Sequence, residues 1–176
     1  MKFFNAALFV GASLIAAGAN AEVTAVDDAG FVSSHRLVLQ GSVAEAYKAL
    51  TEEIAQWWDA EHSYSGVAAN FSLDPRAGGC FCEKLPNGGE VEHMRVVFAD
   101  PAGTLRLSGG LGPLQEMAVA GSMLFELEDI GNNQTRLDYT YSVAGFMPGG
   151  LGMMAGPVDQ VQLGQLQRLQ AYLAAK

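Results

Sequence analysis

Apolar and polar residues alternate along most of this chain, and the period lengthens to that of a helix in only two places. The alternation predicts β-strands at residues 31–40, 71–74, 80–84, 90–98, 104–108, 117–128 and 135–144. The last of these is the most regular, because apolar residues occupy every second position from Leu137 to Val143. Such a pattern is typical of an antiparallel sheet that packs one face and exposes the other to water.

A helix is predicted directly after the first strand. Ser42 and Glu45 form a capping box, in which each side chain accepts a hydrogen bond from a backbone N–H that the helix leaves unpaired. Apolar residues then recur at helical spacing up to Trp57 and Trp58. This pattern predicts one helix, or two short helices separated near Thr51.

The second helical stretch lies at the C-terminus. Pro157 favours the first position of a helix, and the apolar stripe that follows consists of Val158, Val161, Leu166, Leu169 and Leu173. Residues 145–156 are rich in glycine and methionine and predict an irregular loop. We interpret this loop either as an apolar lip over a cavity or as a plain connection. Residues 22–30 carry no periodic pattern and predict an irregular lead-in.

Strands grouped between helices predict the α+β class. The expected fold is a curved antiparallel sheet of about six to seven strands wrapped around the long C-terminal helix. A sheet and a helix that bury their apolar faces against each other in this way tend to enclose a cavity. Residues 22–176 contain no repeat and no long linker, so we expect them to form one domain.

The first residues predict export. Lys2 precedes an apolar run at residues 3–18, and residues 19–21 have the small-x-small pattern of a cleavage site. We therefore expect residues 1–21 to be a signal peptide cleaved after Ala21, and the remainder to be periplasmic or secreted. The apolar run is shorter than the about 20 residues that a transmembrane helix needs, so stable membrane insertion after cleavage is not expected.

Charge and motifs exclude several classes of function. The formal net charge is −9 at pH 7, which repels nucleic acids and anionic lipid headgroups, so no nucleic-acid partner is expected. The sequence contains no G-x-S-x-G, P-loop or H-E-x-x-H motif. Its cysteines, histidines and methionines lack metal-ligand spacing, so neither a metal nor another cofactor is expected. Nothing in the sequence indicates an oligomeric state.

The two cysteines, Cys80 and Cys82, allow two interpretations. Residues two apart on a regular strand have Cα atoms about 6.6 Å apart, which is close to the upper limit for a disulfide. A bridge would require a bulge, which Gly78 and Gly79 would permit. The favoured interpretation is two small buried hydrophobic side chains.

The order of elements and several segments resemble the START-like superfamily with the helix-grip fold, also called the SRPBCC group. The matching segments are residues 41–58, 71–83, 93–96, 105–113, 135–141 and the C-terminal helix. The similarity is greatest to the branch of the Hsp90-ATPase-activator C-terminal domain. It implies a deep, largely apolar cavity in a fold that hosts many functions. Because Hsp90 is cytosolic, an exported chain is not expected to act as its activator.

We therefore expect a carrier or sensor of a small apolar ligand. The residues expected to line its cavity or the lip are Trp58, Phe71, Phe81, Met123, Tyr139, Tyr141, Met147, Met153 and Met154. One alternative is a cyclase- or hydrolase-like enzyme in which His93 is a general base oriented by Glu83 or Glu92. Glu83 is the favoured partner, since adjacent antiparallel strands would place it opposite His93. A second alternative is a protein-interaction module, which predicts a filled core and an exposed apolar patch.

Overall fold

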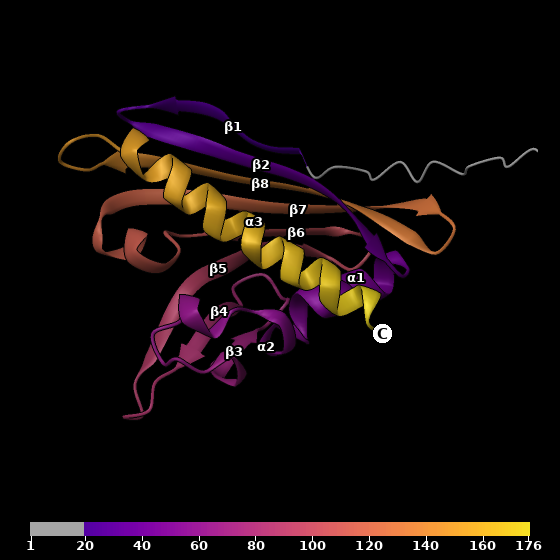
Figure 1. Cartoon of the computed structure of the whole chain (residues 1–176). Helices are drawn as coiled ribbons and strands as arrows, with labels where there is room; N and C mark the ends of the chain where they lie inside the picture. Colours follow the sequence, from indigo (N-terminus) through magenta and orange to yellow (C-terminus); the bar gives the residue numbers. More distant parts are fainter. Residues whose placement is uncertain (1–19) are drawn as a thin grey trace, which may run out of the picture.

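The C-terminal helix α3 (Gly152–Ala174) lies across one face of an eight-stranded antiparallel sheet in a computed structural model that describes residues 20–176 (Figure 1). The spatial order of the strands is β1-β2-β8-β7-β6-β5-β4-β3. Their bounds are β1 Asn20–Asp27, β2 Gly30–Gln40, β3 Phe71–Leu73, β4 Cys80–Lys84, β5 Glu90–Asp100, β6 Thr104–Ser108, β7 Ala118–Gly131 and β8 Gln134–Phe146. The predicted α+β class and the helix-on-sheet arrangement are confirmed, and the expected six to seven strands become eight.

The additional strand is β1, where the sequence predicted an irregular lead-in. Its physical origin is a tight hairpin turn. The Asp27 carboxylate accepts hydrogen bonds from the backbone N–H groups of Ala29 (2.8 Å) and Gly30 (2.9 Å), which returns the chain along β2. The predicted signal peptide lies outside the described residues, apart from Asn20 and Ala21 at the start of β1.

The helices between β2 and β3 follow the predicted capping and spacing. Ser42 caps α1 (Val43–Thr51) in a capping box with Glu45, and a break after Thr51 separates it from α2 (Ile54–Trp57). Short 3-10 turns follow at Ala60–His62 and Ala68–Asn70, and a third, Gly112–Glu116, connects β6 to β7. Both α1 and α2 pack against α3, so the three helices cover the same face of the sheet (Figure 1).

The glycine-rich stretch before the last helix is more regular than predicted. Strand β8 extends to Phe146, and α3 already begins at Gly152, so Pro157 lies inside the helix instead of at its first position. Leu151 is fully buried and Ala155 is 4% exposed. Their burial against the sheet outweighs the low helix propensity of the glycines, which is a tertiary effect that local sequence does not show. No helix among residues 20–176 has the length and apolarity needed to cross a membrane.

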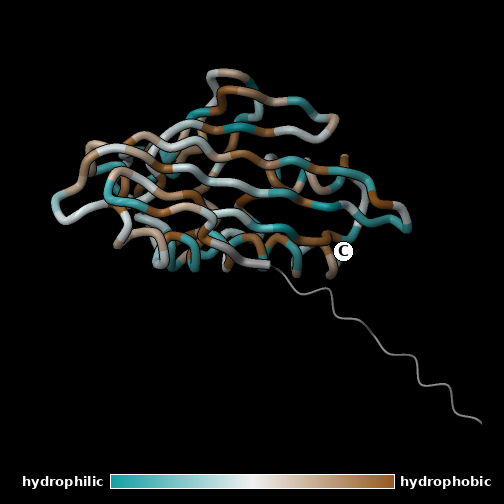
Figure 2. The backbone as a smooth tube through the Cα atoms, turned by 90° about the horizontal axis from the view of Figure 1, so that it is seen from above, coloured by the Kyte–Doolittle hydropathy of each residue, from teal (hydrophilic) through white to brown (hydrophobic). Residues whose placement is uncertain are grey.

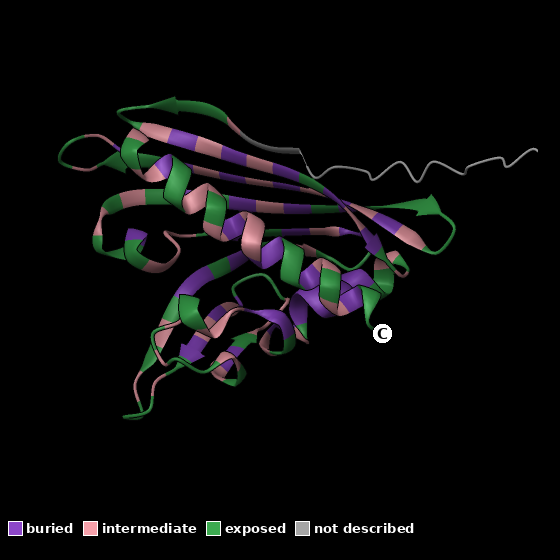
Figure 3. Ribbon diagram, viewed as in Figure 1, coloured by how far each residue is buried: buried purple, intermediate pink, exposed green. Residues whose placement is uncertain are grey.

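The core lies between the concave face of the sheet and the helices. Along β8 the four alternating apolar residues from Leu137 to Val143 are at most 2% exposed. Buried and exposed positions alternate along the strands in Figure 3, and apolar and polar positions interleave in the same way in Figure 2. The period-two pattern therefore predicted correctly which side of the sheet is packed.

A β-bulge interrupts the pairing of β4 with β5. Phe81 pairs with Met94 and Cys82 pairs with Glu92, so His93 is an extra residue on β5. Beside this bulge Cys80 and Cys82 form a disulfide, with their Cα atoms 5.3 Å apart. This corrects the favoured interpretation of two separate thiols, because the local twist that a bulge adds brings the two residues closer than on a regular strand.

Candidate functional site

A cavity of about 320 Å³ lies between α3, the sheet and the loop that follows α2. Its lining residues are Trp58, Glu61, His62, Ser63, Tyr64, His93, Leu111, Gly112, Pro113, Leu114, Tyr141, Met154, Pro157, Val158, Val161 and Gln162. Aromatic and aliphatic side chains supply most of the wall, and a few polar groups interrupt it. This combination is characteristic of small-molecule sites.

One wall is held in place by Tyr141 on β8. Its hydroxyl donates to the carbonyl of Gly109 (3.2 Å) and accepts from the N–H of Leu111 (3.0 Å), which fixes the loop that leads into the third 3-10 turn. Burial raises the pKa of Tyr141 to about 12, so the hydroxyl keeps its proton at neutral pH. Gly121 leaves room for the ring, since a Cβ atom there would lie 2.7 Å from it. Tyr141 therefore shapes the cavity, and its only hydroxyl proton is already used.

The opposite wall is the loop after α2, which is tied to its own turn and to α3. The indole N–H of Trp58 donates to the carbonyl of His62 (3.1 Å). The Asp59 carboxylate accepts from the N–H of Glu61 (3.1 Å), and the Asp59 N–H donates to Oε1 of Gln165 on α3 (2.9 Å). These contacts hold the loop against the helix, so the cavity wall is preformed.

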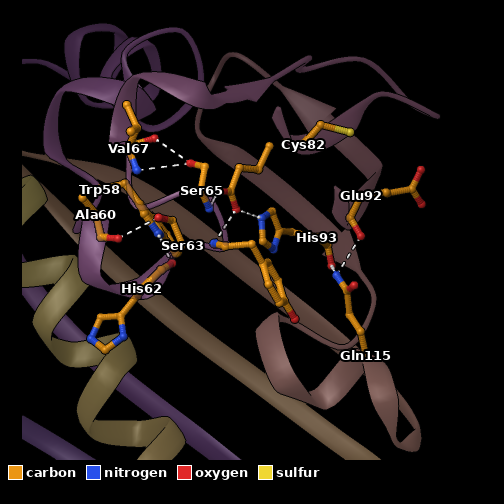
Figure 4. Close-up of polar contacts among 12 residues, drawn as sticks. Trp58, Ala60, His62, Ser63, Ser65, Val67, Cys82, Glu92, His93 and Gln115 are labelled. Carbon is orange, nitrogen blue, oxygen red and sulfur yellow. Dashed lines mark hydrogen bonds and ion pairs between the residues drawn. The ribbon is translucent and has the colours of Figure 1, made fainter. Parts of the chain in front are cut away.

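The β5 bulge places His93 at the cavity. Because of the extra residue, His93 and Met94 are consecutive and yet both buried, with 4% and 1% of their surfaces exposed. Gln115 holds the bulge from the third 3-10 turn, as its amide N–H donates to the carbonyls of Glu92 (2.7 Å) and His93 (3.2 Å) (Figure 4). A regular strand would have turned one of the two side chains outward.

Glu83 on β4 is the polar partner of His93. Its fully buried carboxylate accepts from Nε2 of His93 (2.9 Å) and from the backbone N–H groups of Tyr64 (3.1 Å) and Ser65 (2.5 Å). The predicted pair is thus in contact, and it lies beside the loop that carries Ser63 and Ser65 (Figure 4). An ionised carboxylate can only accept, so Nε2 of His93 carries a proton. Nδ1 of His93 is buried and has no hydrogen-bond partner among the described residues.

The surroundings of this pair set its protonation. Burial raises the pKa of Glu83, but hydrogen bonds from Ser65, Tyr64 and His93 outweigh that effect, and the net pKa is lowered. Burial lowers the pKa of His93 more than the attraction of Glu83 raises it. At neutral pH the pair therefore consists of a carboxylate and a neutral imidazole whose Nδ1 is a base.

The structure separates the predicted ligand-binding residues into three groups. Trp58, Tyr141 and Met154 line the cavity. Phe71 and Phe81 do not line it, because their rings pack against Trp58 and His93 from behind. The remaining four, Met123, Tyr139, Met147 and Met153, also lie outside the lining. Met123 and Tyr139 are buried in the core, Met147 packs against it, and Met153 is 63% exposed.

Gln162 was not among the predicted residues, yet it lines the cavity from α3 and is only 4% exposed. A signal was present, because Gln162 and Leu166 are four residues apart and share one helix face. A polar residue in an apolar stripe indicates either a buried hydrogen bond or a ligand contact. Among residues 20–176, no group of three or more histidine, cysteine or acidic side chains gathers in a way that would hold a metal ion.

No protein-family model matches the chain, and neither does any curated protein. Solved structures do resemble it. An uncharacterised protein from Rhizobium leguminosarum superposes with a TM-score of 0.59 at 18% identity, over 82% of this chain and 97% of that one. A protein from Rhizobium loti superposes with a TM-score of 0.59 at 22% identity, over 80% of this chain and 94% of that one.

Two further neighbours come from biosynthetic settings. DynU16, from the dynemicin biosynthetic locus, gives a TM-score of 0.56 at 20% identity over 84% of this chain. The di-domain ARO/CYC BexL gives a TM-score of 0.55 at 16% identity over 80% of this chain. This chain spans about half of each, 48% of DynU16 and 45% of BexL. At such identities the similarity shows the fold alone, which is of the helix-grip type.

Proposed function

We propose that this chain binds a small apolar ligand in the cavity between α3 and the sheet, as a carrier or sensor. The observation that carries the proposal is the cavity itself, with aromatic and aliphatic walls contributed by the loop after α2, the sheet and α3. The helix-grip neighbours, two of them from biosynthetic settings, add a small-molecule context.

Burial of apolar surface supplies the driving force. A ligand that buries about 300 Å² of apolar surface gains about 7 kcal/mol at roughly 25 cal/mol per Å². The loss of translational and rotational freedom offsets part of that gain. The remainder is smaller than about 7 kcal/mol, so the dissociation constant should be weaker than about 10 μM. The preformed walls reduce the cost of ordering the site.

Native mass spectrometry of the protein purified from its own source, followed by organic extraction, tests the proposal. We expect an apolar compound to co-purify with the wild-type protein and to be lost in Val161→Phe, which fills the cavity. Val97→Phe is the matched control, because Val97 is 49% exposed on β5 and should retain the compound. A ligand-free mass, together with no thermal shift from a panel of lipids and aromatic compounds, would instead favour a protein-interaction module.

A second candidate function rests on the His93–Glu83 pair. The Glu83 carboxylate holds the Nε2–H of His93, which leaves a buried lone pair on Nδ1 beside the cavity. This arrangement suits a general base in a cyclase- or hydrolase-like reaction. The expected signature is that His93→Ala abolishes turnover while the ligand still binds. Equal turnover in the wild-type protein and this variant would exclude His93 as the base.

Export and the finer family assignment belong to the same proposal. The disulfide between Cys80 and Cys82 supports an oxidising compartment, in agreement with a signal peptide at residues 1–21. N-terminal sequencing of the mature protein should find Glu22 first. Membership of the START-like superfamily is supported by the helix-grip neighbours, whereas the branch of the Hsp90-ATPase activator has only the sequence segments in its favour.

A further inference from the structure

We infer that the cavity selects neutral ring compounds that carry a carbonyl group, and that Gln162 donates the hydrogen bond that recognises this group. The inference rests on the proposed ligand-binding function and narrows the ligand to a chemical class. Three observations carry it: the fixed orientation of one buried amide, the charge of the lining, and the shape of the walls.

Gln162 belongs to the cavity lining, and its amide N–H groups are free among the described residues. Its Oε1 accepts a hydrogen bond from the hydroxyl of Tyr139 (2.8 Å), while its Nε2 makes no hydrogen bond to any described residue. Tyr139 is 1% exposed, and burial raises its pKa well above the usual value, so the hydroxyl keeps a proton that needs an acceptor. A rotated amide would leave that proton without an acceptor in the described part of the chain, which is costly for a buried group.

Gln162 is also a poor fit to a purely structural role. The side chain is 96% buried in total, since only 4% of its surface is exposed, and it belongs to the cavity lining. The hydrogen bond from Tyr139 uses one of the four hydrogen-bonding positions of the amide and leaves both N–H donors free. Gln162 shares the cavity lining with Met154, Val158 and Val161, and a ligand oxygen would complete its unused donors.

The charge of the lining excludes an anionic ligand. Among the described residues, no lysine or arginine lines the cavity, and Glu61 is an acidic member of the lining. A carboxylate that entered would lose its hydration without gaining a cationic partner. A ketone, ester or amide carbonyl accepts from Nε2 of Gln162 at a far smaller desolvation cost.

The walls favour a ring system over a flexible chain. Trp58, Tyr64 and His93 contribute flat aromatic surfaces, and Pro113 and Pro157 contribute rigid ones. The volume of about 320 Å³ lies at the small end of ligand pockets, which span about 300–1,000 Å³. One or two fused rings with a short carbonyl substituent match both the volume and the free N–H donors of the one amide.

Three matched probes test the class: 2-acetylnaphthalene, 2-ethylnaphthalene and 2-naphthoate. Their dissociation constants are measured by quenching of tryptophan fluorescence, because Trp58 lines the cavity. The acetyl and ethyl compounds have nearly the same shape and differ in the carbonyl oxygen. We expect the acetyl compound to bind tightest and the naphthoate at least tenfold more weakly. Tightest binding of the naphthoate would overturn the neutral class.

Variants then assign the recognition to Gln162. The ratio of the ethyl to the acetyl dissociation constant should fall about tenfold in Gln162→Met, which corresponds to one buried hydrogen bond. Gln170→Met is the matched control, since Gln170 lies further along α3, bonds to the carbonyl of Val38 (2.7 Å) and does not line the cavity. Its ratio should equal that of the wild-type protein.

Tyr139→Phe provides a second route in case Gln162→Met does not fold. Removal of the hydroxyl lets the amide turn, so the ratio should fall about threefold while the affinity for the ethyl compound is unchanged, which a loss of packing alone would not produce. An unchanged ratio in both variants would overturn the inference and leave ligand binding intact. Failure of all three probes to bind would overturn the proposed function, and the inference with it.

Discussion

Two histidine–carboxylate pairs with buried imidazoles occur among residues 20–176, and they differ in the elements that each pair connects. Nε2 of His93 lies 2.9 Å from Glu83, and Nε2 of His35 lies 3.0 Å from Asp159. In both pairs Nδ1 is buried without a partner among the described residues. Of these two histidines, His93 lines the cavity and His35 does not.

The partners of each carboxylate explain the difference. Glu83 accepts hydrogen bonds from backbone N–H groups of the loop beside the cavity, so it holds that wall in place. It also accepts from Nε2 of His93, which fixes the tautomer of the imidazole. Asp159 lies on α3 and accepts from the hydroxyl of Ser33 on β2 (2.6 Å), so it fastens the helix to the sheet. The same two residue types thus form a candidate catalytic pair beside the cavity and a structural contact between α3 and β2. Position relative to the cavity decides between the two roles.

Removal of Glu83 is expected to have the largest effect on stability. Glu83→Ala leaves three donors without their acceptor, among them the buried Nε2–H of His93, and should lower the free energy of unfolding by about 3–5 kcal/mol in urea denaturation. Glu92→Ala is the control, because Glu92 is exposed and pairs with Arg95 at the surface, where a loss of less than about 1 kcal/mol is expected. A loss below about 1 kcal/mol for Glu83→Ala would mean that the carboxylate does not hold the wall.

Removal of Asp159 should lower the free energy of unfolding less than removal of Glu83, and it should loosen α3 instead of the cavity loop. Asp159→Ala removes the carboxylate that contacts both the Ser33 hydroxyl and His35, which then have only each other as partners (3.1 Å), and should lower the free energy of unfolding by about 1–3 kcal/mol. Hydrogen exchange should accelerate in the first half of α3 and not in the loop at Tyr64 and Ser65. The exposed neighbour Gln160→Ala serves as the control. Equal acceleration in both regions would erase the distinction between the two pairs.

The disulfide lies beside only one of the pairs, and it should contribute modestly. A bridge that closes a loop of three residues stabilises the fold by about 1.5 kcal/mol in the chain-entropy model. The variant with both Cys80→Ser and Cys82→Ser should lose about that amount in urea denaturation. The imidazole resonances of His93 should shift and those of His35 should not. A shift of His35 alone would contradict the placement of the bulge.

The smallest effect is expected from pH, since the carboxylates offset part of the cost of charging each imidazole. Burial lowers the pKa values of both His93 and His35 below the ordinary 6.5. The unfolded chain then binds more protons, so the stabilisation is complete above pH 6.5 and declines as the pH falls below it. Urea denaturation between pH 8 and pH 5 should show this slope. His93→Gln and His35→Gln should each flatten it, and an unchanged slope in both would contradict the lowered pKa values.

Local sequence predicted one of the two pairs and not the other, for a physical reason. Glu83 and His93 lie on neighbouring strands joined by a short hairpin, so strand pairing alone brings them close. His35 and Asp159 meet only because α3 packs across β2, and no local pattern specifies that packing. The alternation in β8 gave its buried face correctly, because period two is set by the backbone itself. The start of α3 was missed because burial of Leu151 decides it.

The residues that line the cavity were likewise predicted only in part. Trp58, Tyr141 and Met154 could be assigned to it from a general expectation about sheet and helix. Phe71 and Phe81 could not be separated from them, because all are apolar and on inward-facing positions. Gln162 was missed because one polar residue within an apolar stripe does not show whether it contacts the core or a ligand until the packing of α3 is known.

Nuclear magnetic resonance of the methionine methyl groups during a titration with 2-acetylnaphthalene tests ligand binding in the cavity most directly. Met154 lines the cavity, and its neighbour Met153 is 63% exposed, so adjacent residues report on the inside and the outside. Binding in the cavity predicts a saturable shift of the Met154 methyl resonance with little change at Met153. A shift confined to Met153, or none at either residue, would contradict it.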